Sequence, residues 1–80
     1  MDAAQIEAEL QRAEGVLDKL QRERTGEIEK AKAQGQRAEK IGRMLALDAM
    51  MRRENAAFLR SLRERLEEAR LNHQLIAGKR

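Results

Sequence analysis

The apolar residues near the start of the chain recur at the spacing of a coiled-coil helix. Alternating steps of four and three residues separate Ile6, Leu10, Ala13, Leu17 and Leu20. This spacing keeps an apolar stripe on one face of an α-helix, while the acidic residues between its members face water. Asp2 stands before the stripe and Gln5 follows three residues later, which is a capping-box pattern. A first helix is therefore predicted to begin near residue 3.

A second apolar stripe begins after Lys40. Its members are Ile41, Met44, Met51, Phe58, Leu62, Leu66, Ala69 and Ile76, with Leu45 and Leu59 beside them. At about 100° per residue, the centre of this stripe is rotated by more than 90° from the centre of the first. One straight helix therefore cannot present both stripes to one partner, and a break between them is expected.

The connecting residues 21–40 contain one large apolar residue, Ile28, and two glycines. A glycine in the left-handed conformation commonly ends a helix, so we place the break near Gly35. The sequence thus predicts an all-α fold in which helices at about 3–33 and about 37–77 form an antiparallel helical hairpin, or coiled coil. The chain is short enough to be a single small helical domain, completed by oligomerisation or by a partner.

The predicted hairpin brings Leu10 near Leu62 and Ala13 near Phe58. It leaves the last turns of the second helix, with the sequence ARLNHQLIA, extending beyond the first helix. Two alternatives stay open at this point. A turn at Thr25 would give an even longer second helix, and an unbroken helix dimerising in parallel is compatible with the absence of proline.

The stretch MLALDAMM, residues 44–51, is apolar around the whole helix. Met44 and Met51 belong to the second stripe, whereas Leu47 points elsewhere. A helix that is apolar on all sides is normally buried on all sides, and methionine suits a surface that adapts to its partner. We therefore predict a partner or oligomer interface formed by Leu45, Leu47, Met50, Met51, Phe58, Leu62 and Leu66.

Polar residues along the second helix suggest two further roles. Asn55 falls within the stripe, where a polar side chain selects one register at some cost in stability. Asp48 is expected to pair with Arg52 one helical turn away. A basic strip of Arg52, Arg63 and Arg70 runs beside the stripe and could steer an acidic partner or contact nucleic-acid phosphates. A solvated helix face is the ordinary explanation of such a strip.

Composition narrows the classes of function. The chain is 41% hydrophobic and 39% charged, with a net charge of +3, and it has no Cys, Trp, Tyr or Pro. It offers no cysteine nucleophile, nucleophile elbow or phosphate-binding loop, so we expect no enzymatic activity and no cofactor. His73 has no carboxylate three residues before it and is not expected to bind a metal. The amino-terminal residues resemble neither a secretory signal nor a membrane span, and a cytoplasmic location is expected.

Together these features predict a small helical interaction protein, an adaptor or assembly factor, that binds a partner helix or a second copy of itself. In size and architecture the predicted hairpin resembles the small hairpin co-chaperones and assembly factors of bacterial secretion machines, which implies a role in keeping an aggregation-prone subunit soluble. The alternative is a basic coiled-coil regulatory protein that binds nucleic acid.

Overall fold

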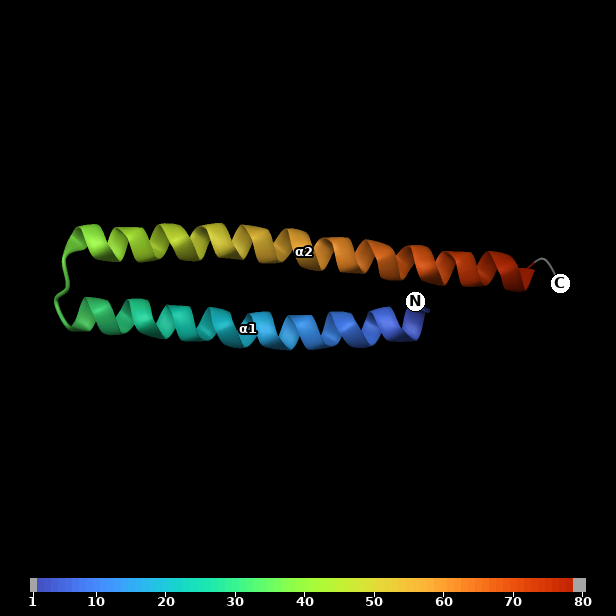
Figure 1. The fold of residues 1–80 in the computed structure, drawn as a ribbon, viewed down its shortest axis with the longest axis horizontal. Coiled ribbons are helices and arrows are strands. Elements are labelled where there is room, and N and C mark those ends of the chain that lie inside the picture. The colour runs from blue at the N-terminus through green and yellow to red at the C-terminus, as the bar shows by residue number, and fades with distance from the viewer. Residues whose placement is uncertain (1, 79–80) are drawn as a thin grey trace.

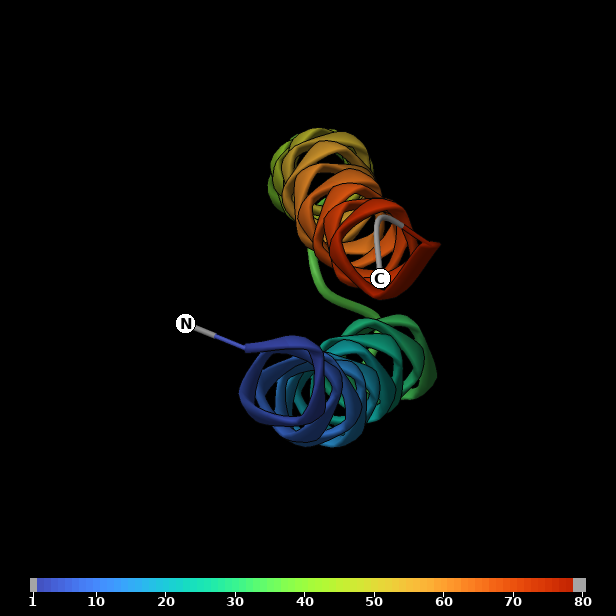
Figure 2. The same ribbon diagram turned by 90° about the vertical axis from the view of Figure 1, so that its right-hand side faces the viewer.

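The computed structural model describes residues 2–78 and contains two helices. Helix α1 spans Ala3–Ala33 and helix α2 spans Ala38–Gly78. They run antiparallel in a single layer, and a short connection joins them at one end (Figures 1 and 2). The molecule measures 67 × 16 × 13 Å. The predicted all-α hairpin is confirmed.

The start of α1 is fixed by the predicted capping box. The Gln5 backbone N–H donates to the Asp2 carboxylate at 2.9 Å, and the Asp2 backbone N–H donates to the Gln5 side-chain oxygen at 3.1 Å. These reciprocal bonds satisfy donors that the first helical turn leaves without intrahelical partners.

The end of α1 is fixed by Gly35, which has a φ of 68°. The Gly35 N–H donates to the carbonyl oxygen of Lys32 at 3.0 Å, and the Gln36 N–H donates to that of Ala31 at 3.1 Å. This pair of bonds is the Schellman motif, which needs the left-handed conformation that glycine adopts without steric cost. The break is therefore at the predicted place, and the alternatives of a turn at Thr25 and of one unbroken helix are wrong.

Most of the buried and half-buried positions lie in one row along each helix, and these rows define the seam along which the helices pack. In α1 the seam consists of Ala3, Ile6, Leu10, Ala13, Leu17, Gln21, Arg24, Ile28 and Ala31. In α2 it consists of Ile41, Met44, Asp48, Met51, Asn55, Leu59, Leu62, Leu66 and Ala69. Each seam contains two consecutive steps of four residues, centred on Leu17 and on Asn55. Each seam nevertheless advances 28 residues in eight steps, from Ala3 to Ala31 and from Ile41 to Ala69, so its average period is 3.5 residues per turn, which is the period of helices that wind about each other.

The seam corrects two positions predicted from the sequence. Leu20 is 42% exposed and Phe58 is 48% exposed, because Gln21 and Leu59 occupy the seam in their place. The second step of four, from Leu17 to Gln21 and from Asn55 to Leu59, takes the seam one residue past Leu20 and Phe58. At about 100° per residue, this turns Leu20 and Phe58 away from the opposite helix.

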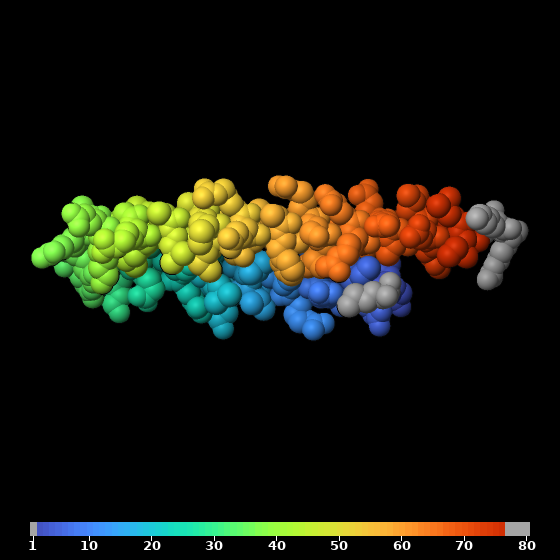
Figure 3. Space-filling model, turned by 45° about the horizontal axis from the view of Figure 1, so that its top comes forward, coloured from blue at the N-terminus to red at the C-terminus, as the bar shows by residue number. Residues whose placement is uncertain are grey.

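The best-packed part of the seam lies at the end away from the turn. Ile6, Leu10, Leu62 and Leu66 form the core cluster there, and Leu62 is fully buried. The contact between Leu10 and Leu62 confirms the predicted alignment. Beyond this core α2 continues past the start of α1, as predicted (Figures 1 and 3). In that overhang the large apolar side chains are exposed: Leu71, Leu75 and Ile76.

Candidate functional site: the two sides of the hairpin

A charged cluster in the middle of the seam sets the register of the two helices. The Arg24 Nε atom donates to Asp48 at 2.9 Å across the interface, and the Arg52 Nε atom donates to the same carboxylate at 2.7 Å. The side chain of Asp48 is only 11% exposed and that of Arg24 only 17%. The hydrogen bonds from Arg24 and then from Arg52 hold the pKa of the Asp48 carboxyl below its ordinary value.

The expected pairing of Asp48 with Arg52 is thus confirmed, but the sequence did not reveal the second partner. Arg24 lies on the other helix, and only the register of the hairpin brings its guanidinium to Asp48. Arg24 also carries a buried Nη2 atom that has no hydrogen-bond partner among the described residues. A buried donor without a partner costs stability, so this position favours a contact that supplies an acceptor.

Polar contacts connect the two helices on one side of the seam. Arg52 donates to the Thr25 hydroxyl at 3.4 Å as well as to Asp48, and Arg70 lies 3.3 Å from Glu7. A groove between the helices on this side is lined partly by Arg63, Glu14 and Asp18. We call this the paired side and define it by Glu7, Glu14, Asp18, Arg52, Arg63 and Arg70.

The basic strip predicted from the sequence therefore faces carboxylates of its own chain. Arg52 and Arg70 each pair with an acidic residue, and Arg63 shares its groove with two of them. The formal charge of these arginines is partly balanced within the hairpin, which reduces the field that they offer to a polyanion.

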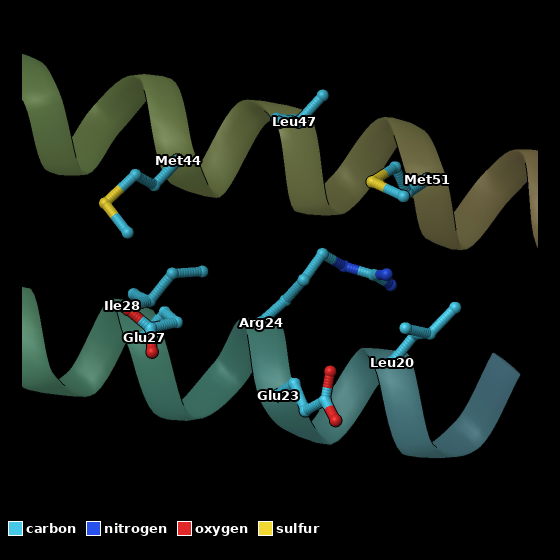
Figure 4. A pocket seen from close by; sticks show the side chains of 8 residues that line it. All are labelled: Leu20, Glu23, Arg24, Glu27, Ile28, Met44, Leu47 and Met51. Atoms are coloured by element: carbon cyan, nitrogen blue, oxygen red, sulfur yellow. The ribbon is translucent and has the colours of Figure 1, made fainter. Parts of the chain in front are cut away.

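The groove on the other side of the seam has a more apolar lining than the groove on the paired side. This groove of about 380 Å³ lies between the helices. Its lining comes from both helices and consists of Leu20, Glu23, Arg24, Glu27, Ile28, Met44, Leu47 and Met51 (Figure 4). Carbon and sulfur atoms form most of its surface, and the Arg24 side chain extends across it towards α2.

The apolar surface continues along the hairpin beyond the groove. Val16 precedes Leu20 by about one turn, and Phe58 follows Met51 by two turns. Both are half exposed, at 53% and 48%. We call this surface the apolar side and define it by Val16, Leu20, Leu47, Met51 and Phe58. Leu47 and Arg52 are about 140° apart around α2, so the apolar and paired sides flank the seam on opposite shoulders.

The structure divides the predicted interface residues among four locations. Leu47, Met51 and Phe58 lie on the apolar side, and Met50 lies further round α2 and is exposed. Leu45 is 45% exposed but lies on the paired side. It shares a face of α2 with Arg63, because the two residues are eighteen positions, or five turns, apart. Leu62 and Leu66 belong to the core of the hairpin itself, and their surfaces are covered by α1.

Asn55 is half buried in the seam, at the level of Leu17 and at the edge of the groove on the paired side. Its predicted role in selecting the register stays a prediction. Among the described residues, the polar contacts that join the two helices are those of Arg24 with Asp48, Arg52 with Thr25 and Arg70 with Glu7.

Other candidate chemistry is sparse. His73 lies in the overhang, in a shallow depression beside Ala3 and Ile76. Within residues 2–78, no three His, Asp or Glu side chains are grouped closely enough to hold a metal ion. None of the helices in that range combines the length and the apolar character needed to cross a membrane.

The chain matches none of the protein families, curated proteins or solved structures with which it was compared. Its function is therefore argued from its own surfaces.

Proposed function

We propose that this protein is a small helical interaction module that docks through its apolar side. The observation that carries the proposal is the gathering of exposed Leu, Phe and Val side chains and half-buried Met side chains from both helices on one side of the seam, around an open groove. Scattered surface hydrophobics are ordinary, but a contiguous apolar surface with a polar surround is typical of an interaction site.

The groove suits a helical partner surface. Two packed helices leave a furrow between them that accepts the apolar ridge of a third helix, and large side chains in that furrow supply most of the affinity. Met44 and Met51 line it, and their unbranched side chains adjust to the shape of what binds. The unpaired Arg24 donor at the groove would favour a partner that brings a hydrogen-bond acceptor to it.

The paired side argues against the alternative of nucleic-acid binding. Arg52 and Arg70 already contact carboxylates of the same chain, so binding to phosphates would have to break those pairs. The acidic residues of α1 also lie along this side and would repel a polyanion. The absence of catalytic activity and the cytoplasmic location stay predictions.

Site-specific photo-crosslinking in an extract of the natural source tests the proposal. A photoreactive residue at position 47 should give discrete adducts, and the same residue at position 45 should give few. The two positions are matched because both hold exposed leucines, 52% and 45% accessible, on opposite shoulders of α2. Adducts at both positions alike, or at neither, would contradict docking through the apolar side.

A further inference from the structure

On the apolar side, the two helices carry opposite patterns of charge around their apolar residues. In α1 the order along this side is Glu9, Val16, Leu20, Glu23 and Glu27, so the charged residues are all acidic. In α2 the order is Lys40, Leu47, Glu54, Phe58 and Arg65, so both ends are basic and one acidic residue, Glu54, lies between the apolar ones.

Helix geometry places these charges on the same faces as the apolar residues. Glu9 and Glu27 are eighteen residues apart, which is five complete turns, so they share one face of α1. In α2, Lys40 shares a face with Phe58 by the same spacing, and Leu47 shares one with Arg65. The charges therefore bracket the apolar residues on each helix of the apolar side.

The register of the hairpin places charged residues of α1 and α2 at similar positions along the length of the apolar side. Because Arg24 lies opposite Asp48, counting equal steps away from this pair places Glu9 opposite residue 63, two residues from Arg65. Glu27 lies opposite Leu45, between Arg43 and Leu47. Two residues of helix are about 3 Å long, well within the reach of these side chains.

We infer that the apolar side binds a second copy of this chain, forming a four-helix bundle whose two-fold axis runs parallel to the helices. In this arrangement α1 of each copy lies over α2 of the other, and all neighbouring helices are antiparallel. The apolar residues of α1 then meet those of α2 at the same height. This inference rests on the proposed function, because it names the occupant of the same surface.

Charge complementarity selects this arrangement. With α1 over α2 of the other copy, Glu9 approaches Arg65 of the second copy, and Glu27 approaches Arg43 and Lys40 of the second copy. The other face-to-face pairing stacks α1 on α1 and α2 on α2. It would bring Glu9 near Glu27 and Lys40 near Arg65, and like charges at an interface oppose association.

The size of the hairpin supports a second copy as the occupant. A two-helix chain buries little of its apolar surface, and its one compact core here is the cluster at the end away from the turn. Pairing two apolar sides would give the middle of each hairpin a second packed surface. Self-complementary patches of this kind are what a two-fold dimer requires.

Light scattering on the purified full chain, with concentration taken from refractive index because Trp and Tyr are absent, provides the first test. The expected mass is twice the 9.2 kDa of one chain. L47E should give a helical monomer, and L45E should stay dimeric. A wild-type mass of one chain at all concentrations, with full helicity, would overturn the second copy as occupant. The crosslinking at position 47 would then still decide the proposed function.

Charge reversal tests the arrangement without touching the apolar residues. The variant E9K/E27K places like charges opposite each other at both ends of the apolar side, and it should raise the dimer dissociation constant on the order of tenfold at low salt. Adding R43E and R65E, which reverses the charges nearest to positions 27 and 9 in the other copy, should restore the dimer. The control E29K/E64K adds the same charge on outward faces and should change the dissociation constant little.

The outcomes separate the two arrangements. If α1 packs on α1 and α2 on α2, E9K/E27K replaces one repulsive pair by another and leaves the dissociation constant unchanged, which would overturn the inference. Failure of the fourfold exchange to restore the dimer would overturn it as well. Circular dichroism on each variant shows whether the hairpin itself stays folded.

Discussion

The two sides of this hairpin flank the same seam, yet the side chains on one are paired within the chain and those on the other are exposed to solvent. On the paired side, arginines of α2 meet acidic residues within the chain, and Asp48 accepts from two guanidinium groups. On the apolar side, side chains such as Leu20 and Leu47 extend into solvent around a groove. This difference shows that formal charge is a poor guide to an interaction surface when the charged residues already form ion pairs within the chain.

The largest expected effect comes from the seam that both sides share. Leu62→Ala removes a fully buried side chain, and we expect it to lower the free energy of unfolding by about 2–5 kcal/mol. Leu75→Ala, in the overhang and 56% exposed, makes the same truncation and should change it by less than about 0.5 kcal/mol. Chemical denaturation followed by circular dichroism measures both, and equal effects would contradict the packing of the core.

The next largest effect concerns the paired side alone. Asp48→Asn removes the carboxylate that Arg24 and Arg52 share and leaves the Arg24 charge uncompensated in the seam. Because the pKa of Asp48 is lowered in the folded state, its ionisation stabilises the hairpin fully above the ordinary aspartate pKa of about 4 and does so less as pH falls below that value.

Thermal unfolding of wild type and Asp48→Asn between pH 7 and pH 2 checks this sign. The wild type should be clearly more stable at pH 7, and the difference should shrink as the solution is acidified below about pH 4. A difference that is constant over this range would mean that the carboxylate charge contributes nothing to joining the helices.

A smaller effect tests the turn that aligns the two sides. Gly35→Ala forces a side chain into the left-handed conformation and should cost about 1–2 kcal/mol. Gly26→Ala is the matched control, since Gly26 lies within α1 with open space around it, and there alanine should stabilise by up to about 1 kcal/mol. The same sign for both substitutions would contradict the Schellman turn.

The smallest effect concerns the outer ion pair of the paired side. Glu7 and Arg70 are both about half exposed, so Glu7→Gln should cost less than about 0.5 kcal/mol. Unfolding in 0.5 M salt should abolish the difference, because solvent ions screen an exposed pair. A cost above 1 kcal/mol would show that this pair is more important to the hairpin than its exposure implies.

Sequence patterning predicted the elements of the fold more fully than their contacts. The capping box at Asp2, the break at Gly35 and the overhang of α2 were all readable, because each depends on local chemistry or on helix length. The step of the seam from Leu17 to Gln21 was not readable, since a glutamine carries no apolar signal. The same shift moved Phe58 from the predicted seam to the apolar side.

The sequence predicted which residue types form the candidate site, but it did not predict which of them lie on the apolar side and which on the paired side. The run from Met44 to Met51 indicated an apolar surface wider than one seam, but only the register separates Leu45 from Leu47 by side. The pairing of Arg24 with Asp48 joins residues 24 positions apart, and no local pattern signals such a contact.

The position of the core at the end away from the turn also has a mechanical consequence. The connection at Gly35 joins the helices at one end of the hairpin. Packed leucine and isoleucine side chains hold them together at the opposite end. Between these ends the hydrogen bond from Arg24 to the buried Asp48 also joins the helices. The helices are thus held at three levels along their shared length, and one cannot slide past the other without breaking buried contacts.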